Sequence, residues 1–364
     1  MPKLLIVVGT RPNFIKVTRF KPMARARGGI DVRIVHTGQH YSANMADVFF
    51  DQFGLRPDRF LGIGPGTPNA QMASVMRELE PVIAEEGPDM VMVVGDVNST
   101  LAAAITANKM GVPLAHLESG LRSFDRTMPE EHNRVLTDHL TDHFFVTEQS
   151  GLDNLRKEGL DRGGNVHFVG NTMIDTLVAY APQVEASPVL DDLGLGTGGH
   201  VLMTIHRPAT VDDPQRLAEL LELIAHISAA RQVVFPIHPR TRRNIASFGL
   251  QPRLDALTGL VLTEPLDYFA FQKLIATCAF ILTDSGGIQE ESTFRRVPCL
   301  TLRPNTERPS TVDIGTNELV PLDDAAIRAA VQRIEAGGHR KGAVPPLWDG
   351  RATERILDVL AQLP

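Results

Sequence analysis

Cysteine, tryptophan and tyrosine are scarce in this chain of 364 residues, which has two, one and three of them respectively. Both cysteines, Cys278 and Cys299, lie within or beside apolar runs. We therefore expect two buried thiols, with no disulfide framework and no cysteine-based metal site. Aromatic residues make up only 5% of the chain and its formal net charge is −7. This composition does not favour a nucleic-acid-binding surface.

Long hydrophobic runs are also missing. The first apolar run, Leu4 to Val8, is closed by Arg11 and Pro12 and is too short for the core of a signal peptide or a membrane span. We expect a cytoplasmic protein without a membrane partner. With 43% hydrophobic and 22% charged residues, the composition is that of an ordinary globular protein. Its length exceeds one ordinary core, so we expect two domains.

Short apolar runs that favour strands alternate with helical patterns such as 69–86 and 99–110. The strand-like runs form two series: 3–8, 31–36, 90–94, 113–117, 143–146 and 166–169, then 201–204, 233–236, 260–262, 279–283 and 299–302. The segment 180–199, rich in Pro, Gly, Ser and Asp, separates the two series and favours a linker. The alternation predicts two doubly wound parallel sheets, whose ligands bind at the carboxyl ends of the strands. A shared ligand would lie in a cleft between the two domains.

The most informative segment is Asp284–Glu291, which directly follows an apolar run. Its pattern predicts a strand, a tight turn at Ser285, Gly286 and Gly287, and the start of a helix. Two glycines let the backbone approach a ligand and expose successive N–H groups where the helix dipole favours an anion. Two acidic residues about one helical turn later, Glu290 and Glu291, suit paired ribose hydroxyl groups. The segment therefore indicates a nucleotide diphosphate site.

In the first domain, ionisable residues follow consecutive predicted strands. Arg11 and Lys16 follow the first strand, where two cations oppose the helix dipole and favour an anionic ligand over a purely solvated role. Asp96, Glu118 and Glu130 follow later strands. Each carboxylate alone has a structural alternative, such as a helix cap or a first-turn preference. Three together indicate one crevice, because the carboxyl ends of parallel strands converge.

In the second domain, two histidines follow neighbouring predicted strands, each within two residues of an arginine. His206 precedes Arg207, and His238 lies two residues before Arg240. This arrangement favours phosphate binding or acid–base chemistry. The chain has no HExxH motif, so we assign no metal, and no GxGxxG fingerprint follows the first strand, which argues against a dinucleotide oxidoreductase.

Taken in order, these motifs resemble the non-hydrolysing UDP-N-acetylglucosamine 2-epimerases nearly end to end. The matching segments are Gly9–Lys16, Thr37–Tyr41, Gly95–Thr100, His116–Arg122, Pro129–Arg134, His206–Arg207, Asp284–Glu291 and Thr306–Pro309. The resemblance implies a GT-B-like fold of two Rossmann-like domains, 1–172 and 173–349, in a homodimer. It also implies that a last helix, within 350–364, packs back on the first domain.

The resemblance implies reversible inversion at C2 between UDP-GlcNAc and UDP-ManNAc, through loss of UDP to 2-acetamidoglucal and re-addition, without a cofactor. It makes Asp96, Glu118 and Glu130 the acid–base and electrostatic carboxylates, assisted by Lys16 and His206. We assign UDP binding to the residues Arg11, His238, Ser285, Gly286, Gly287, Glu291 and Arg308. Gln39 and His40 match a region that some members use as a regulatory site.

The chain departs from the family pattern at three places. Asn13-Phe14 stands where many members have Glu-Ala, Ser119 replaces the usual Ala, and His206 opens a different loop, through Asp213. Other functions considered are a 2-epimerase of UDP-linked diacetamido uronic acids, a hydrolysing epimerase and a GT-B glycosyltransferase. A sensor that binds a nucleotide sugar without turnover is a further alternative, although binding alone does not call for three carboxylates.

Overall fold

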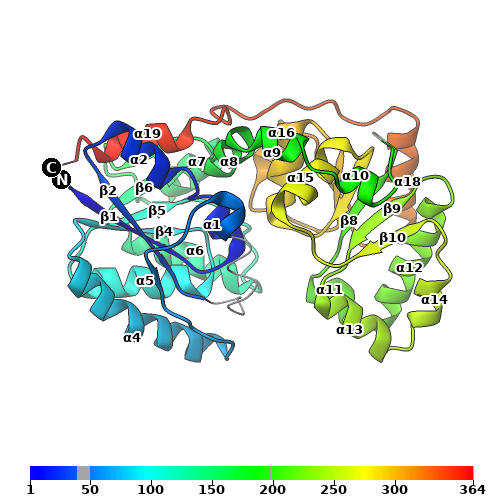
Figure 1. Ribbon diagram of the computed structural model, residues 1–364, viewed down its shortest axis with the longest axis horizontal. Helices are drawn as coiled ribbons and strands as arrows, with labels where there is room; N and C mark the ends of the chain where they lie inside the picture. Colours follow the sequence, from blue (N-terminus) through cyan, green and yellow to red (C-terminus); the bar gives the residue numbers. More distant parts are fainter. Residues whose placement is uncertain (39–49, 197–198, 364) are drawn as a thin grey trace. The chain divides into compact units, whose positions relative to one another are not determined.

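The computed structural model describes residues 1–38, 50–196 and 199–363. The chain divides into two compact units, Met1–Ala179 with Pro346–Pro364, and Tyr180–Pro345 (Figure 1). None of the helices in the described part of the chain is long and apolar enough to cross a membrane. Cys278 and Cys299 are both buried and free, as the sequence predicted.

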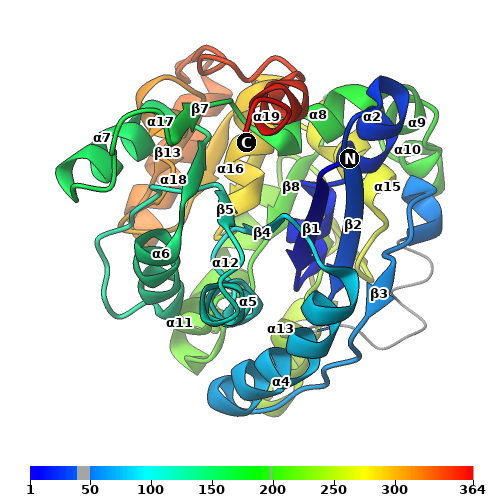
Figure 2. The same cartoon turned by 90° about the vertical axis from the view of Figure 1, so that its left-hand side faces the viewer.

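The first unit is built on a seven-stranded parallel sheet in the order β3-β2-β1-β4-β5-β6-β7 (Figure 2). Its strands are β1 (Lys3–Val8), β2 (Asp31–His36), β3 (Arg59–Phe60), β4 (Met90–Val94), β5 (Leu114–Leu117), β6 (His143–Val146) and β7 (Val166–Phe168). Its helices are α1 (Arg11–Ile15), α2 (Phe20–Arg27), α4 (Pro68–Glu86), α5 (Asn98–Lys109), α6 (Pro129–Leu140), α7 (Gln149–Lys157), α8 (Thr172–Ala179) and α19 (Ala352–Leu360). All five residues of β4 are buried because helices cover both faces of the sheet.

The second unit holds a six-stranded parallel sheet in the order β10-β9-β8-β11-β12-β13. Its strands are β8 (Val201–Thr204), β9 (Val233–Pro236), β10 (Leu260–Thr263), β11 (Phe280–Thr283), β12 (Cys299–Thr301) and β13 (Asn317–Leu319). Its helices are α9 (Ala181–Glu185), α10 (Val189–Asp192), α11 (Pro208–Val211), α12 (Pro214–Ser228), α13 (Pro239–Ser247), α14 (Gln251–Asp255), α15 (Tyr268–Thr277), α16 (Gly286–Arg295), α17 (Pro309–Asp313) and α18 (Asp324–Glu335). Val201 and Met203 of β8 join one hydrophobic cluster and Leu202 joins another, so both faces of this sheet are buried.

The two sheets share one connectivity, which confirms the predicted fold of two doubly wound α/β domains. In each unit the first strand lies in the middle, with the next two strands on one side and the later strands on the other. The chain reverses its direction of winding between β1 and β4, and again between β8 and β11. In such sheets the ligand crevice lies beyond the carboxyl ends of the strands at this switch point.

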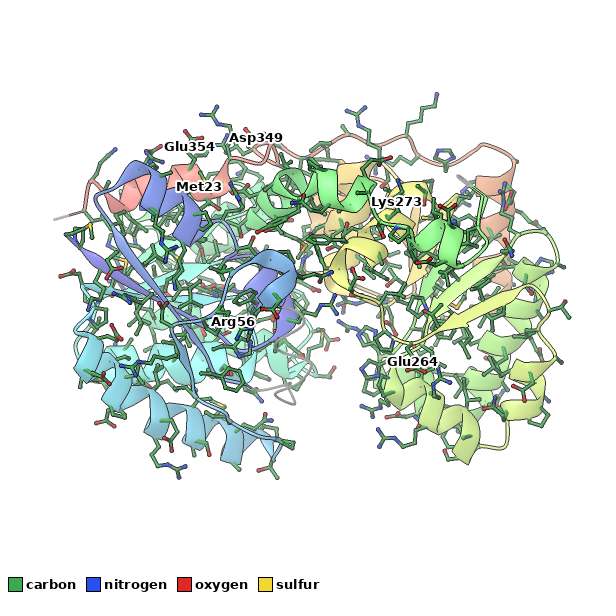
Figure 3. The ribbon with its side chains drawn as sticks, viewed as in Figure 1. Met23, Arg56, Glu264, Lys273, Asp349 and Glu354 are labelled. Carbon is green, nitrogen blue, oxygen red and sulfur yellow. The ribbon has the colours of Figure 1, made fainter. Side chains whose placement is uncertain are left out.

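The C-terminal segment returns to the first unit. α19 packs against α2 and α8; Glu354 of α19 and Met23 of α2 are labelled in Figure 3, and the Arg27 guanidinium of α2 donates to the Glu354 carbonyl at 3.1 Å. The Asp175 carboxylate accepts hydrogen bonds from the backbone N–H groups of Ala352 and Thr353, at 3.0 and 2.5 Å. The indole of Trp348, just before α19, donates to the Thr147 carbonyl at 3.0 Å. The unit therefore combines the first and last segments of the chain.

Three features differ from the sequence-based expectation. The segment predicted as a linker contains α9 and α10, which pack against α15 within the second unit. Two edge strands, β3 and β13, were not predicted. Both are short, and β3 is exposed on both residues, so neither carries the apolar run that identified the other strands.

Candidate functional site

The carboxyl ends of β1 and β5 bring Lys16 and Glu118 together. The Lys16 ammonium group forms an ion pair with Oε2 of Glu118, and the two side chains keep only 5% and 3% of their exposed area. The other carboxylate oxygen, Oε1, is buried and has no hydrogen-bond partner within the residues described. Lys16 was predicted to face an anionic ligand, and the anion beside it in the protein itself is Glu118. Burial removes both charged groups from water, and the attraction between the two opposite charges offsets part of that cost.

Gly95 directly follows β4, and because it has no side chain it leaves room for the side chains of Lys16 and Glu118. Its φ is +65°, and a Cβ there would lie 3.0 Å from Nδ2 of Asn13, 3.4 Å from Oε2 of Glu118 and 3.7 Å from Nζ of Lys16. Asn13, one of the departures from the family pattern, is buried and donates from Nδ2 to the Val94 carbonyl at 3.2 Å. The amide therefore holds α1 against the end of β4.

Asp96 is joined to Glu131 through Arg134. The Arg134 guanidinium lies 2.6 Å from Oδ2 of Asp96 and 2.7 Å from Oε2 of Glu131. Glu131 also accepts hydrogen bonds from the backbone N–H groups of Ser123 and Phe124, each at 2.9 Å. Burial alone would raise the pKa of Glu131, but these hydrogen bonds and the Arg134 charge outweigh it and hold the pKa below its ordinary value.

Glu130 differs from the other two predicted carboxylates. It is half-buried in the first turn of α6. Within the described ranges 1–38, 50–196 and 199–363, its carboxylate has no hydrogen-bond or ion-pair partner.

Arg11 is half-buried at the first position of α1. The two predicted regulatory residues, Gln39 and His40, lie outside the described residues.

A buried network that the sequence did not reveal ties the ends of β4 and β5 together. The His116 ring places Nε2 2.8 Å from the Gly95 carbonyl and Nδ1 2.7 Å from the Asp138 carboxylate. The second Asp138 oxygen accepts from the Gly120 N–H at 3.0 Å and lies 2.7 Å from the Arg122 guanidinium. Burial would raise the pKa of Asp138, but His116 and Arg122 outweigh it and hold the pKa low. The network therefore fixes the backbone on both sides of Glu118.

In the second unit, His206 and Asp284 meet at the switch point between β8 and β11. Nδ1 of His206 lies 3.0 Å from Oδ1 of Asp284, and Oδ2 accepts from the backbone N–H groups of His206 and Arg207 at 2.9 and 2.7 Å. Burial would raise the pKa of Asp284, but these contacts lower it overall. The His238 ring centre lies 5.6 Å from that of His206. Burial, reinforced by the positive charges of His206 and Arg240, lowers the pKa of His238.

The predicted nucleotide turn forms the start of α16. Ser285 is the residue preceding the helix, and Gly286 and Gly287 open it. A Cβ on Gly286 would lie 2.8 Å from Oε1 of Glu307 and 3.0 Å from Nη1 of Arg308. A larger residue at position 286 would displace the ends of these two side chains, so the helix start lies directly against Glu307 and Arg308.

Arg308 lies among carboxylates. Its Nε is 2.8 Å from Oε2 of Glu290, and its Nη1 contacts Glu307. Arg303 pairs with the same Glu307 at 2.9 Å. Glu291, the predicted ribose ligand, is buried on α16 with 6% of its surface exposed. The second unit thus brings a helix N-terminus, an arginine and buried carboxylates to the strand ends, with Arg308 paired to Glu290 and Glu307 of the protein itself.

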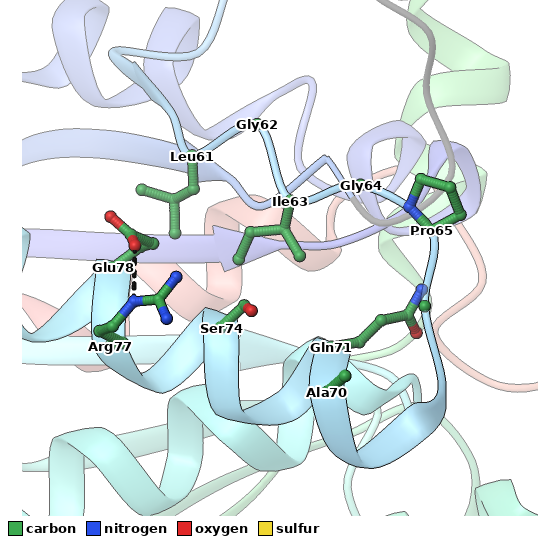
Figure 4. Close-up of a pocket in the computed structure, with 11 residues that line it drawn as sticks. Leu61, Gly62, Ile63, Gly64, Pro65, Ala70, Gln71, Ser74, Arg77 and Glu78 are labelled. Carbon is green, nitrogen blue, oxygen red and sulfur yellow. Dashed lines mark hydrogen bonds and ion pairs between the residues drawn. The ribbon is translucent and has the colours of Figure 1, made fainter.

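A separate pocket of about 300 Å³ lies between the 61–66 loop and the first turns of α4 (Figure 4). Gln71 and Ser74 line it, and Arg77 and Glu78, paired at 2.9 Å, stand at one end. None of the predicted catalytic residues lines this pocket.

Across the described residues, no group of three or more His, Cys, Asp or Glu side chains is placed to hold a metal ion.

Known proteins resemble this chain over almost its full length. The UDP-N-acetylglucosamine 2-epimerase family model matches residues 23–361. The UDP-N-acetylglucosamine 2-epimerase of Methanocaldococcus jannaschii is 39% identical, with 98% of each chain covered. A crystal structure of the M. jannaschii enzyme in complex with UDP-GlcNAc and UDP superposes with a TM-score of 0.90, covering 98% of this chain and 99% of that one.

A second relative has a different substrate in its name. The UDP-2,3-diacetamido-2,3-dideoxy-D-glucuronate 2-epimerase of Pseudomonas aeruginosa is 38% identical over 99% of this chain and 100% of its own. The fold also matches a sucrose-phosphate synthase of Thermosynechococcus elongatus, 12% identical, with a TM-score of 0.60 and coverage of 99% and 95%. The predicted GT-B-like fold and enzyme class are thereby confirmed. The chain belongs to the UDP-N-acetylglucosamine 2-epimerase family of isomerases.

Proposed function

We propose that this protein interconverts UDP-GlcNAc and UDP-ManNAc by inverting C2 of the sugar. The observation that carries the proposal is the buried Glu118–Lys16 pair beside Asp96 at the switch point of the first unit. It occurs in a chain similar along its length to enzymes named for this reaction. Binding alone would not call for a buried carboxylate with an oxygen left to accept a proton.

The chemistry must overcome a weakly acidic C2–H bond, because no carbonyl adjoins C2. In the proposed route the C1–O bond breaks and its electron pair leaves with UDP. The C2 proton passes to a carboxylate, and the electrons of the C–H bond form the C1–C2 double bond of 2-acetamidoglucal. UDP then adds back to C1 while a proton reaches the opposite face of C2. Each direction needs stabilisation of the departing diphosphate and acid–base groups near the ring.

The second unit supplies the groups suited to the diphosphate. The N–H groups of Gly286 and Gly287 lie at the start of a ten-residue helix, whose dipole favours an anion, whereas the Ser285 N–H donates to the Thr283 hydroxyl group at 3.0 Å and leaves the Ser285 side chain as its proposed contact. Arg308 is held against this start, and His238 lies at the end of β9. Glu291 is the proposed ribose ligand. The same donors that bind UDP in the substrate would stabilise it as the leaving group.

The first unit supplies the acid–base groups. Oε1 of Glu118 is buried and has no partner within the described residues, so it is the oxygen best suited to accept a proton from the sugar. Lys16 compensates the charge of Glu118, and Arg134 that of Asp96. Glu130 supplies a further carboxylate. His206, oriented by Asp284, assists.

The proposal is tested by incubating the protein with UDP-GlcNAc in deuterated water and following C2 by NMR. We expect deuterium at C2 and a mixture of two UDP-sugars without any added cofactor. Glu118→Gln should retain UDP binding and lose most exchange, whereas Glu80→Gln, on the exposed face of α4, should behave as the wild type. Absence of exchange by the wild-type protein would refute the proposal, and free ManNAc as the main product would replace it with hydrolysis.

A second candidate substrate is the UDP-linked diacetamido uronic acid named for the Pseudomonas relative. This relative is 38% identical, close to the 39% of the M. jannaschii enzyme. Running the same exchange experiment with both nucleotide sugars, each at several concentrations, compares their kcat/KM values directly. A higher value for UDP-GlcNAc supports the first substrate, and a higher value for the uronic acid supports the second.

We also propose a homodimer, which the family resemblance implies. The chain has a mass of 39.8 kDa, so light scattering after gel filtration should give about twice this value. A mass equal to a single chain at assay concentration would contradict the dimer.

A further inference from the structure

Phe124 has a strained backbone and an exposed side chain. Its φ is +58°, a left-handed conformation that is unusual for a bulky residue without glycine's freedom. The residue is 70% exposed, so packing in the core of its own unit does not account for the conformation. Residues held in such conformations are concentrated at functional sites, where the surrounding structure imposes them. Phe124 is therefore a candidate for contact with a ligand.

The strained conformation is imposed by Glu131. One carboxylate oxygen accepts from the Phe124 N–H, and the other accepts from both the N–H and the hydroxyl group of Ser123, all at 2.9 Å. Arg134 holds Glu131 in place at 2.7 Å and contacts Asp96 at 2.6 Å. The backbone of Phe124 is thus linked through two side chains, Glu131 and Arg134, to the proposed catalytic carboxylate Asp96.

Phe124 belongs to the loop that joins two of the groups proposed to act at C2. It lies midway in the loop that leaves β5 after Glu118 and enters α6 before Glu130. Any group that removes or adds a proton at C2 also lies near the acetamido substituent of that carbon. The acetamido methyl is the apolar part of this substituent, and an exposed aromatic ring is a suitable partner for it.

We propose that Phe124 contacts the acetamido methyl of the nucleotide sugar and is a specificity-determining residue. The inference rests on the proposed function, because it assumes a 2-acetamido sugar at the strand ends of the first unit. The ring favours acetamido sugars over sugars with a hydroxyl group at C2. It makes no contact with UDP.

The test is calorimetric binding of UDP-GlcNAc, UDP-glucose and UDP to the wild type and to Phe124→Gly. Removing the ring should weaken UDP-GlcNAc binding about tenfold, the change expected from losing an apolar contact of roughly 50 Å². Affinities for UDP-glucose and UDP should not change. Because glycine adopts positive φ freely, the thermal midpoint of Phe124→Gly should not fall, which separates lost contact from misfolding.

Two further variants sharpen the comparison. Phe124→Leu, which keeps apolar area, should retain most of the affinity for UDP-GlcNAc. Leu136→Ala removes another exposed apolar side chain, 51% exposed on α6, and should bind all three ligands as the wild type does.

Unchanged UDP-GlcNAc affinity in Phe124→Gly would overturn the assignment, as would an equal loss for all three ligands. A change in oligomeric mass with unchanged affinity would assign the ring to a subunit contact instead. The deuterium exchange of the wild type separates this inference from the function it rests on. If the wild type exchanges C2 and Phe124→Gly binds normally, only the role of Phe124 fails; if the wild type does not exchange, the proposed function fails.

Discussion

Replacing Gly95 with alanine adds one methyl group at the centre of the first unit's site. At φ +65° an alanine costs about 1–2 kcal/mol of backbone strain. The backbone cannot easily change this angle, because the Gly95 N–H donates to the Leu117 carbonyl at 3.0 Å and its own carbonyl lies 2.8 Å from His116 Nε2. The new Cβ, 3.0 Å from Asn13 and 3.4 Å from Glu118, must therefore displace those side chains by a few tenths of an ångström.

The expected result is a loss of activity larger than the loss of stability. A displacement of this size at reacting groups lowers kcat by about 10–100-fold. The affinity for UDP should be unchanged, because the proposed diphosphate ligands belong to the other unit. Stability can be followed by the fluorescence of Trp348, the one tryptophan in the sequence, which is buried in the first unit. The midpoint of unfolding should fall by an amount equivalent to about 1–2 kcal/mol.

Gly111→Ala is the matched control. Its φ is +69°, so the backbone strain is nearly the same, but a Cβ there meets no atom within 4 Å. This variant should lose the same stability and keep full C2 exchange. Equal activity of the two variants would refute the reasoning, since it would show that the space beside Asn13 and Glu118 is not needed for turnover.

Three further variants test the charged groups. Lys16→Met should lower the free energy of unfolding by about 3–5 kcal/mol, because it leaves the Glu118 charge buried and unpaired. The double variant Lys16→Met/Glu118→Gln should regain most of the lost free energy of unfolding. Urea unfolding monitored by fluorescence measures both. Asp138→Asn should lower kcat at least tenfold with an unchanged KM in the exchange assay, since it loosens the backbone beside Glu118. The pKa of Asp284 is lowered in the folded protein, so its stabilising contribution is complete above the ordinary carboxyl pKa near 4 and is lost as the pH falls further. The destabilisation caused by Asp284→Asn, measured by circular dichroism, should therefore be larger at pH 7 than near pH 3.

The strands of both sheets were predictable because burial on two faces leaves a continuous apolar run. β1, β2 and β4 begin and end at the residues the sequence indicated. The run is missing from the short edge strands β3 and β13, whereas the other two edge strands, β7 and β10, were predicted. β13, Asn317–Leu319, has only one fully buried residue, so hydrogen bonding to β12 rather than composition makes it a strand. The segment 180–199 was misread for a related reason, since the short helices α9 and α10 are stabilised by packing on α15.

The predicted carboxylates of the site followed from the rule that ligands bind at strand ends, but their partners did not. Arg134 reaches Asp96 across 38 residues of sequence, and Asp138 reaches His116 across 22. Neither spacing is a motif; both pairs exist because β4, β5 and α6 pack together. Sequence patterns identify which side chains stand at a strand end, while the fold decides which charges meet.

Lys16 shows what this difference means for the chemistry. The sequence predicts Lys16 at a helix start with a negative partner; in the structure Lys16 instead follows the last residue of the short helix α1, and its partner is Glu118, 102 residues further along the chain. A carboxylate that must accept a proton from carbon has to be held near the ring without being surrounded by donors. Lys16 satisfies one oxygen of Glu118 and the geometry of Gly95 leaves room beside it, while Oε1 keeps no partner within the described residues. The pair thus compensates a buried charge and leaves available Oε1, the oxygen that accepts the C2 proton in the proposed mechanism, so a single added methyl group at Gly95 should reduce turnover more than stability.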